Sequence, residues 1–437
     1  MKLKWIHWIY HGKSEINRYT INSLDTNPFK NLIVTSGKDA LIKIWNINSF
    51  QNKGSKHNLI VKPQKSQYNT ENFCTVFKIY ERQVNIVRWS INGNFLASGG
   101  DDGRLVIHRD SYFKGNKKNF FKIFFIFKHF QNDITSINWS PDSNFISTTS
   151  QTSNIIIYAI KKKQVFAKIT SRVFSLKGSC WDPLGYFLAT QSTSQGIKIW
   201  KTSKWNLCKT IEFVTNSKLI LKYSQKSTPG KPNWTSCGKF IIFYDNFTIE
   251  RNHFLRAIER AGNFIKYKIF FQGEKYINNI RGSPRIYTGN SLFKISSIFA
   301  VSTEDGKLYL WALNFSKITI LIKNLSGKTF TDLSWGFDGY QLYITTLEGN
   351  VFVIHFNSDE LGRVLNVKDH IEMLKNLSKK NHNSSNGSFF FSSFKNELLN
   401  SLNLKYLFIF PPLRFKKNIL SSSIFNKKLF RFKINLV

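Results

Sequence analysis

Cysteine, acidic residues and long apolar runs are all scarce in this chain of 437 residues. Its four cysteines lie far apart, with no Cys-x-x-Cys pair and no histidine at zinc-finger spacing, which excludes a disulfide framework and a structural zinc site. No apolar run approaches the roughly 20 residues of a membrane-spanning helix, and no apolar leader opens the chain. We therefore expect reduced thiols, no metal, no cofactor, and a protein that is neither exported nor membrane-spanning.

Acidic side chains number 26 against 63 Lys and Arg, which gives a formal net charge of +37. Clustered cations displace counterions from phosphates, so one interpretation is contact with DNA or another polyanion. The other is biased composition, because Phe, Lys, Asn and Ile are over-used together and the lysines are spread along the chain. Charge by itself therefore does not identify a partner.

What the sequence has instead is a repeat. Each copy is a strand that ends in Trp, a polar turn and a second apolar strand, as in Trp-Ser-Pro-Asp-Ser-Asn-Phe-Ile-Ser. Successive copies are 50, 42, 53 and 101 residues apart, the last roughly two periods, which is typical of four-stranded propeller blades. The repeats begin at Trp89, Trp139, Trp181, Trp234 and Trp335.

A second pattern supports this interpretation. WD-repeat blades often carry a turn Asp six residues before a Trp, where the carboxylate accepts bonds from turn amides and the indole packs between blades. The pattern is complete in two blades, lacks its Trp in the second, where His108 follows, and lacks its Asp in the fourth. The residues that keep it are Asp39 with Trp45, Asp102, Trp200, and Asp305 with Trp311.

The predicted fold is all-β: a seven-bladed WD-repeat β-propeller with a poorly ordered basic C-terminal tail. We expect the propeller over residues 1–362 and a low-complexity, basic and apolar tail over 363–437. The strand-like segment Leu3 to His11 is expected to form the outer strand of the last blade and so to close the ring. The blades are expected at about 14–48, 80–112, 122–162, 170–212, 215–260, 270–314 and 325–357, with a polar insertion at 48–72.

No catalytic constellation emerges. Asp101 and Asp102 are adjacent in a turn, where carboxylates seldom converge on one substrate. His7 and His11 lie on a strand, where side chains four apart do not converge on a metal. The basic and aromatic stretch Lys114 to Lys128 could stack on bases, but strand aromatics facing a core explain it as well. We expect no catalytic, cofactor-binding or metal-binding residues.

Several strings resemble one family, the HIRA/Hir histone chaperones. They include MKLKWIHW at the start, VNIVRWSINGNFLASGGDDGRLVIHRDSYFKG, DITSINWSPDSNFIS, LKGSCWDPLGYFLATQS and TDLSWGFDGYQLY, ending in SDELG at 358–362. The p60-type WD subunit of chromatin assembly factor one shares the SGGDD, WDPLG and DELG strings. WKTSKWNL and IERAGNF are similar to HIRA alone, which favours the HIRA/Hir family.

The resemblance implies a non-enzymatic nuclear scaffold for replication-independent assembly of histones H3–H4 and for transcriptional repression. It also implies docking of a ubinuclein/Hpc-like subunit, whereas no convincing motif for the anti-silencing chaperone stands in the tail. Because histones are basic, a +37 propeller is expected to reach them through a complex and to touch DNA nonspecifically. The alternatives are the replication-coupled assembly subunit and an RNA-associated propeller.

Overall fold

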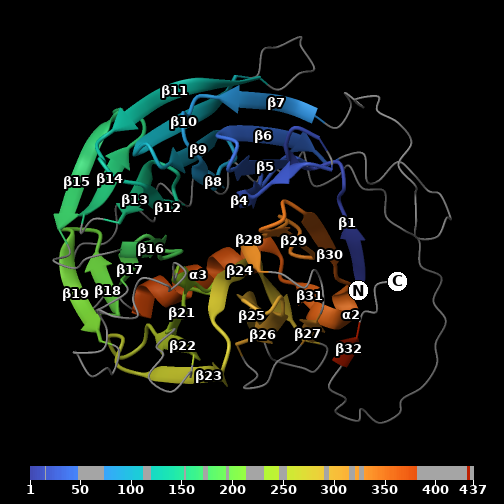
Figure 1. Cartoon of the computed structure of the whole chain (residues 1–437). Coiled ribbons are helices and arrows are strands. Elements are labelled where there is room, and N and C mark those ends of the chain that lie inside the picture. The colour runs from blue at the N-terminus through green and yellow to red at the C-terminus, as the bar shows by residue number, and fades with distance from the viewer. Residues whose placement is uncertain are drawn as a thin grey trace.

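Seven antiparallel sheets form the blades of a β-propeller around a central axis (Figure 1). The computed structural model describes residues 1–14, 16–47, 73–111, 120–151, 154–170, 176–192, 196–212, 231–245, 253–289, 295–313, 320–323, 329–380 and 431–433. The predicted seven-bladed, all-β fold is thus confirmed. The insertion expected at 48–72 lies outside the described residues.

In the first six blades, four strands follow one another along the chain from the innermost to the outermost. The first blade has β4 (Ile21–Thr26), β5 (Leu32–Gly37), β6 (Leu41–Asn46) and β7 (Phe73–Lys78). The second has β8 (Val84–Trp89), β9 (Phe95–Gly100), β10 (Arg104–Ser111) and β11 (Phe120–Lys128). The third has β12 (Ile134–Trp139), β13 (Phe145–Ser150), β14 (Asn154–Ala159) and β15 (Gln164–Thr170).

The remaining blades repeat this order. The fourth has β16 (Leu176–Trp181), β17 (Phe187–Ser192), β18 (Ile197–Lys201) and β19 (Asn206–Ile211). The fifth has β20 (Asn233–Trp234), β21 (Phe240–Asp245), β22 (His253–Glu259) and β23 (Tyr267–Gly273). The sixth has β24 (Ile277–Thr288), β25 (Ile295–Thr303), β26 (Leu308–Ala312) and β27 (Ile320–Lys323). The seventh has β28 (Phe330–Trp335), β29 (Gln341–Thr346) and β30 (Val351–His355).

The outer strand of the seventh blade comes from the other end of the chain. Strand β1 (Lys2–Trp5) pairs antiparallel with β30, with Lys2 opposite His355 and Trp5 opposite Phe352. This is the position expected for the N-terminal segment, although the strand is shorter than Leu3 to His11. The pairing covers the edge of β30, which would otherwise offer unpaired N–H and C=O groups to another chain.

The blade limits differ from the expected ones by one strand. Phe120–Lys128 was expected to open the third blade, but as β11 it pairs with β10 and completes the second. Likewise β7 completes the first blade beyond residue 48, and β23 completes the fifth beyond residue 260. The Trp-led turn marks the innermost pair of strands, so the strand just ahead of each repeat belongs to the preceding blade.

The fourth residue after each repeat Trp explains the turn composition. This position has a positive φ in all five turns, between 58° and 78°. Glycine adopts that left-handed conformation without a Cβ penalty, and four of the five turns have it there. The positions are Gly93, Ser143, Gly185, Gly238 and Gly339.

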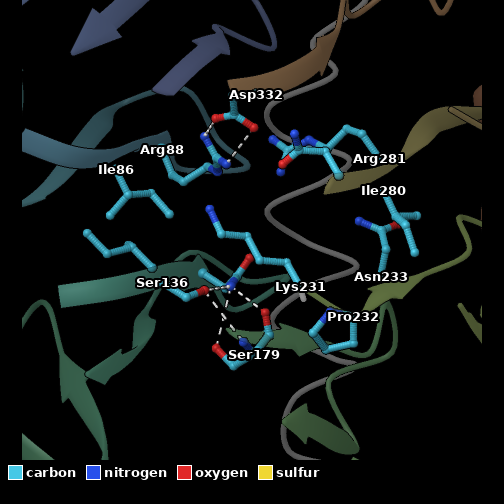
Figure 2. Close-up of a pocket in the computed structure, with 13 residues that line it drawn as sticks. Ile86, Arg88, Ser136, Ser179, Lys231, Pro232, Asn233, Ile280, Arg281 and Asp332 are labelled. Atoms are coloured by element: carbon cyan, nitrogen blue, oxygen red, sulfur yellow. Dashed lines mark hydrogen bonds and ion pairs between the residues drawn. The ribbon is translucent and has the colours of Figure 1, made fainter. Parts of the chain in front are cut away.

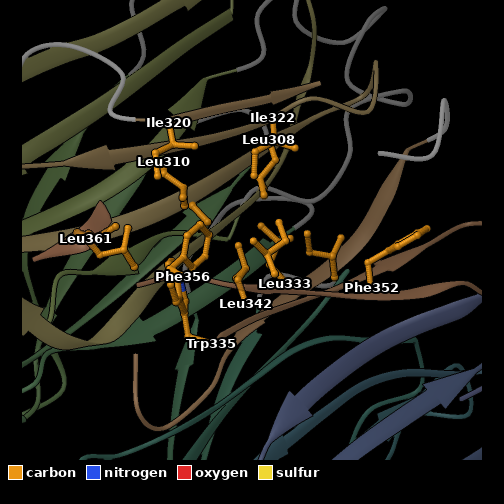
Figure 3. Close-up of a cluster of buried hydrophobic side chains, with 14 of the residues drawn as sticks. Leu308, Leu310, Ile320, Ile322, Leu333, Trp335, Leu342, Phe352, Phe356 and Leu361 are labelled. Atoms are coloured by element: carbon orange, nitrogen blue, oxygen red, sulfur yellow. The ribbon is translucent and has the colours of Figure 1, made fainter. Parts of the chain in front are cut away.

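Apolar side chains from neighbouring blades form the cores between them. Figure 3 shows the cluster between the sixth and seventh blades, where Leu308 and Leu310 of β26 approach Leu333, Trp335 and Leu342. Leu308, Leu310 and Leu342 are fully buried. Complete burial of such a side chain contributes about 1.5–3 kcal/mol, so the contacts between blades stabilise the ring.

The chain continues beyond the expected end of the propeller as α2 (Ser358–Leu361), β31 (Arg363–Val364) and α3 (Val367–Lys380). β31 pairs with β24, and α3 buries Ile371 and Leu374 while His370 Nε2 lies 3.0 Å from the carbonyl oxygen of Ser236. Residues 363–380 thus pack on the ring, unlike the poor order expected of the tail, because Ile371 and Leu374 share one face of a helix and bury it. Of residues 381–437, only β32 (Arg431–Lys433), which runs parallel to β27, lies within the described residues.

Two short strands, β2 (His11–Gly12) and β3 (Arg18–Tyr19), form a separate ladder before the first blade. Among the described residues, no helix is both long and apolar enough to cross a membrane.

Candidate functional site

The innermost strands line a channel along the propeller axis. Residues just ahead of the repeat Trp, among them Arg88 and Asp332, line a pocket shown in Figure 2, which we call the channel pocket. Its charged residues are Arg88 of β8, Lys231, Arg281 of β24 and Asp332 of β28, and Asp25 of β4 contacts it through Arg281.

Arg88 and Asp332 form a buried ion pair across the channel. Arg88 Nη1 lies 2.9 Å from Asp332 Oδ2, and its Nη2 lies 3.3 Å from Oδ1. Asp332 Oδ2 also accepts hydrogen bonds from the Ser23 hydroxyl at 2.7 Å and the Leu24 amide at 3.2 Å. Burial alone would raise the pKa of Asp332, but Arg88, Lys231 and Arg281 outweigh it and hold that pKa well below its usual range.

A second ion pair joins the sixth blade to the first. Arg281 Nη2 lies 2.8 Å from Asp25 Oδ1, which also accepts from the Ser334 hydroxyl at 3.0 Å. Asp25 Oδ2 accepts from the backbone amide of Trp89 at 2.9 Å. Burial and the neighbouring charge of Arg88 lower the pKa of Arg281. The two pairs connect the first, second, sixth and seventh blades at the axis.

Lys231 contributes a third cation to the same pocket. Its stem lies against Gly178 of β16, where an added Cβ would stand 2.9 Å from Lys231 Cγ and 3.0 Å from its Cα. Burial, with Arg88 and Arg281 acting in the same direction against Asp332, lowers the pKa of Lys231 to about 8. Within the described part of the chain, no hydrogen-bond or ion-pair partner of its ammonium group is found.

The turn Asp of the first blade belongs to a buried hydrogen-bond chain. The Trp45 indole donates to the Thr35 hydroxyl at 2.8 Å, and that hydroxyl lies 2.9 Å from His11 Nε2. His11 Nδ1 lies 2.7 Å from Asp39 Oδ1, and Asp39 also accepts from the backbone amides of Gly12 and Leu41, each at 3.2 Å. Burial lowers the pKa of His11 despite Asp39, so its ring is neutral and donates from Nδ1.

The other turn positions hold simpler contacts. Asp102 accepts from the Arg104 amide at 3.1 Å, and Asp305 accepts from the Thr303 hydroxyl at 2.5 Å. The Trp200 indole donates to Thr190 at 3.0 Å, as Trp45 does to Thr35. Trp311 is fully buried against Phe299 and Tyr309.

The repeat Trp residues link neighbouring blades. Trp139 donates to the carbonyl of Arg88, Trp181 to the Ser147 hydroxyl and Trp335 to the carbonyl of Arg281, each at 3.0 Å. The indole N–H groups of Trp89 and Trp234 have no partner among the described residues. The sequence-predicted positions therefore lie in and between the blades and not in one common site.

Two of the strings that carried the family resemblance meet in space. Asp182 of WDPLG forms a buried ion pair with Arg260 of IERAGNF, and the rings of Phe187 and Phe264 lie 5.2 Å apart between their centroids. Arg88 of VNIVRW and Asp332 of TDLSW meet in the same way at the axis. These matching strings therefore preserve contacts between blades and do not by themselves mark a partner surface.

Sequence reasoning missed the channel pocket. The signal was present, because Arg88 directly precedes a repeat Trp and Asp332 stands three residues before one. His11, interpreted as incidental, lies instead in the hydrogen-bond chain of the first blade. No three His, Cys, Asp or Glu residues within the described ranges are arranged to hold a metal ion.

The fold and its repeats define a WD-repeat propeller: the family model "WD domain, G-beta repeat" matches residues 10–46, 72–109 and 121–158. The chain is 27% identical over 374 residues to Protein HIR1 of Cryptococcus neoformans, covering 82% of this chain and 40% of that protein. It is 25% identical over 400 residues to Protein hir1 of Schizosaccharomyces pombe, covering 87% and 40%. Protein HIR1 of Kluyveromyces lactis is 24% identical over 409 residues, covering 86% and 45%.

The resemblance to the WD-repeat portion of the HIR family, expected from the sequence, is therefore confirmed. The chain spans about two fifths of the length of the curated relatives it matches. A WD-repeat propeller with HIR-named relatives points to a scaffold and not to an enzyme.

Proposed function

We propose that this chain is the propeller scaffold of a HIR-like histone chaperone that acts in the nucleus. In this role it supports replication-independent assembly of histones H3–H4 into nucleosomes and represses transcription. The observation that carries the proposal is the similarity to HIR proteins across more than four fifths of the chain, with all seven blades present. The whole activity would need partners, because a propeller acts by presenting loops on a rigid ring.

The charge of the chain shapes how it would meet histones. A net charge of +37 repels basic histones, so contact with H3–H4 is expected through other subunits, among them a ubinuclein/Hpc-like protein docked on the propeller. The ion pairs of Arg88 and Arg281 hold four blades together at the axis, which fixes these blades relative to one another. Such a platform fits a subunit that orders partners and performs no chemistry itself.

Copurification tests the proposal most directly. A tagged chain is expected to recover histones H3–H4 and a ubinuclein/Hpc-like subunit after nuclease treatment. A large assembly-factor subunit together with the replication clamp would instead identify the replication-coupled role, and RNA-dependent partners would identify the RNA-associated one. A control chain lacking residues 1–11 loses ring closure but only two of its 63 Lys and Arg residues, so capture that persists in it reflects charge.

Nonspecific DNA contact is the second part of the proposal. If basic surface side chains neutralise phosphates, the logarithm of the binding constant falls linearly with the logarithm of salt concentration, by about 0.9 per phosphate contact. We expect a slope of several units on random duplex DNA. An affinity indifferent to salt would exclude the DNA contact while leaving the copurification result untouched.

A further inference from the structure

The channel pocket holds more positive than negative charge. Arg88, Lys231 and Arg281 face only two carboxylates, and each carboxylate is already paired with an arginine: Asp332 with Arg88 and Asp25 with Arg281. Lys231 is the cation left over, and Figure 2 shows its side chain extending toward Arg88, Arg281 and Asp332 without a dashed contact. The pocket therefore has one uncompensated positive charge.

Two side chains of the pocket, Lys231 and Asn233, have hydrogen-bond donors for which no acceptor is found among the described residues. Asn233 uses its side-chain oxygen to accept from the Gly282 amide at 3.1 Å, which leaves its NH2 group as a donor. The Lys231 ammonium adds three donors and no acceptor. Asp332 already accepts from Arg88, Ser23 and two backbone amides. A negatively charged ligand that only accepts hydrogen bonds would pair with the donors of Lys231 and Asn233.

We propose that the channel pocket binds a single carboxylate group, supplied by an aspartate or glutamate side chain of an acidic partner segment. One carboxylate matches the single excess charge, whereas a dianionic phosphate would leave a negative charge uncompensated in a partly buried site. Lys231 would pair with the carboxylate, and Asn233 would donate to its second oxygen. This role does not depend on the chromatin function proposed above.

Gly178 positions Lys231 for this contact. The lysine stem crosses the Gly178 backbone so closely that any side chain there would displace it. A substitution at Gly178 would thus move the ammonium group without changing the charge of the pocket. The equivalent position in the second blade is Ile86, which carries a full side chain.

The test is fluorescence anisotropy of the whole chain with a labelled glutamate-glycine repeat peptide at fixed ionic strength. We expect Lys231→Gln to weaken binding about tenfold and Gly178→Ala to weaken it by a similar factor, whereas Lys231→Arg binds within about threefold of the parent. The matched control is Lys239→Gln, which removes one exposed lysine from the same blade. Equal weakening by Lys231→Gln and Lys239→Gln would overturn the proposal, because the peptide would then bind general surface charge.

The pH dependence of peptide binding gives an independent test. The charged groups facing Lys231 are Asp332 from β28, Arg88 from β8 and Arg281 from β24, and none of them changes charge between pH 7 and 9. Since the pKa of Lys231 is about 8, raising the pH from 7 to 9 should weaken peptide binding by up to about tenfold. The Lys231→Arg variant should show no such loss, because arginine stays charged. A pH effect that persists in Lys231→Arg would contradict the role of Lys231.

Competition identifies the ligand group. Displacement of the peptide by glutarate would support recognition of the carboxylate alone. If glutarate does not displace the peptide but peptide binding still depends on Lys231, the carboxylate is recognised as part of the peptide segment. Inorganic phosphate that displaces the peptide more strongly than glutarate at equal ionic strength would overturn the assignment to a carboxylate.

Discussion

The first and second blades fill the Trp position of the repeat with different side chains and different contacts. In the first blade, Trp45, Thr35, His11 and Asp39 form one continuous buried hydrogen-bond chain. In the second blade the corresponding Trp position is His108, whose ring packs against Phe77 in a tilted arrangement with centroids 4.4 Å apart. Neither ring nitrogen of His108 reaches a hydrogen-bond partner among the described residues.

The second blade distributes its polar contacts over separate pairs. Tyr80 hydrogen-bonds Ser98 at 2.8 Å, and Asp102 pairs with Arg104 at 3.1 Å. A blade therefore does not need the complete chain of the first blade, provided that aromatic packing fills the same space. The sequence of the repeat can therefore vary while the four-stranded sheet is retained. Matched substitutions in the two blades should change the free energy of unfolding by different amounts.

Deletion of residues 1–11 should have the largest effect. It removes β1 from β30 and His11 from the first blade at once, whereas Tyr80 and the second blade are untouched. We expect a large fall in melting temperature and loss of a single cooperative transition in calorimetry. A deletion that leaves the melting temperature unchanged would show that neither the closing strand nor the His11 chain stabilises the ring.

Removal of the turn carboxylate should have the next largest effect, and the loss of stability should differ between the two blades. Asp39→Ala leaves the buried His11 ring and two backbone amides without their acceptor, so we expect a loss of about 3 kcal/mol in the free energy of unfolding. Asp102→Ala is the matched change in the second blade and should cost about 1 kcal/mol. Urea unfolding of both variants provides the measurement, and equal losses would refute the difference between the blades.

Acid should destabilise the second blade through His108. Burial lowers the pKa of His108 to about 4. The unfolded chain, with an ordinary pKa near about 6.5, binds the proton first, so stability is complete above about pH 6.5 and falls as the pH drops toward 4. The contribution is up to about 3 kcal/mol by pH 4. Unfolding measured from pH 7 to pH 4 should be less pH-dependent in His108→Phe.

Phenylalanine at the two histidine positions should give effects of opposite sign. His108→Phe replaces an unsatisfied buried ring with an apolar one of similar shape against Phe77, and should stabilise the chain by about 1 kcal/mol at pH 7. His11→Phe in the first blade should destabilise it, because Asp39 and Thr35 lose their partner. If both variants shift stability in the same direction, the contrast between the blades is wrong.

The repeat predicts the ring of blades, but it does not predict the pairing of the outer strands or the presence of helix α3. Strand alternation and the Trp-led turns indicate four-stranded blades and their number, because each turn repeats a local conformation. Strand β11 was expected in the following blade and β7 in none, since pairing of an outer strand such as β11 with β10 is not decided by local pattern. Helix α3 was missed because the low-complexity composition that begins near Asn376 obscured the apolar positions before it.

The channel pocket could not be predicted from the sequence for a different reason. Arg88 and Asp332 are 244 residues apart, and only closure of the ring brings them together. A single Arg before a Trp is equally compatible with a solvated surface position. The excess charge at Lys231 depends on which carboxylates are already paired, which requires the positions of four blades at once.

Closure of the ring by β1 also sets an order of events during synthesis. Lys2 is synthesised before the blades, and its partner His355 is synthesised after nearly all of the propeller has been made. The earlier blades can pair locally as they appear, but the final ladder must wait and then join segments of very large sequence separation, which is a slow step. Throughout that interval the segment of β1 lacks its partner strand, and its backbone N–H and C=O groups stay open to pairing with another chain.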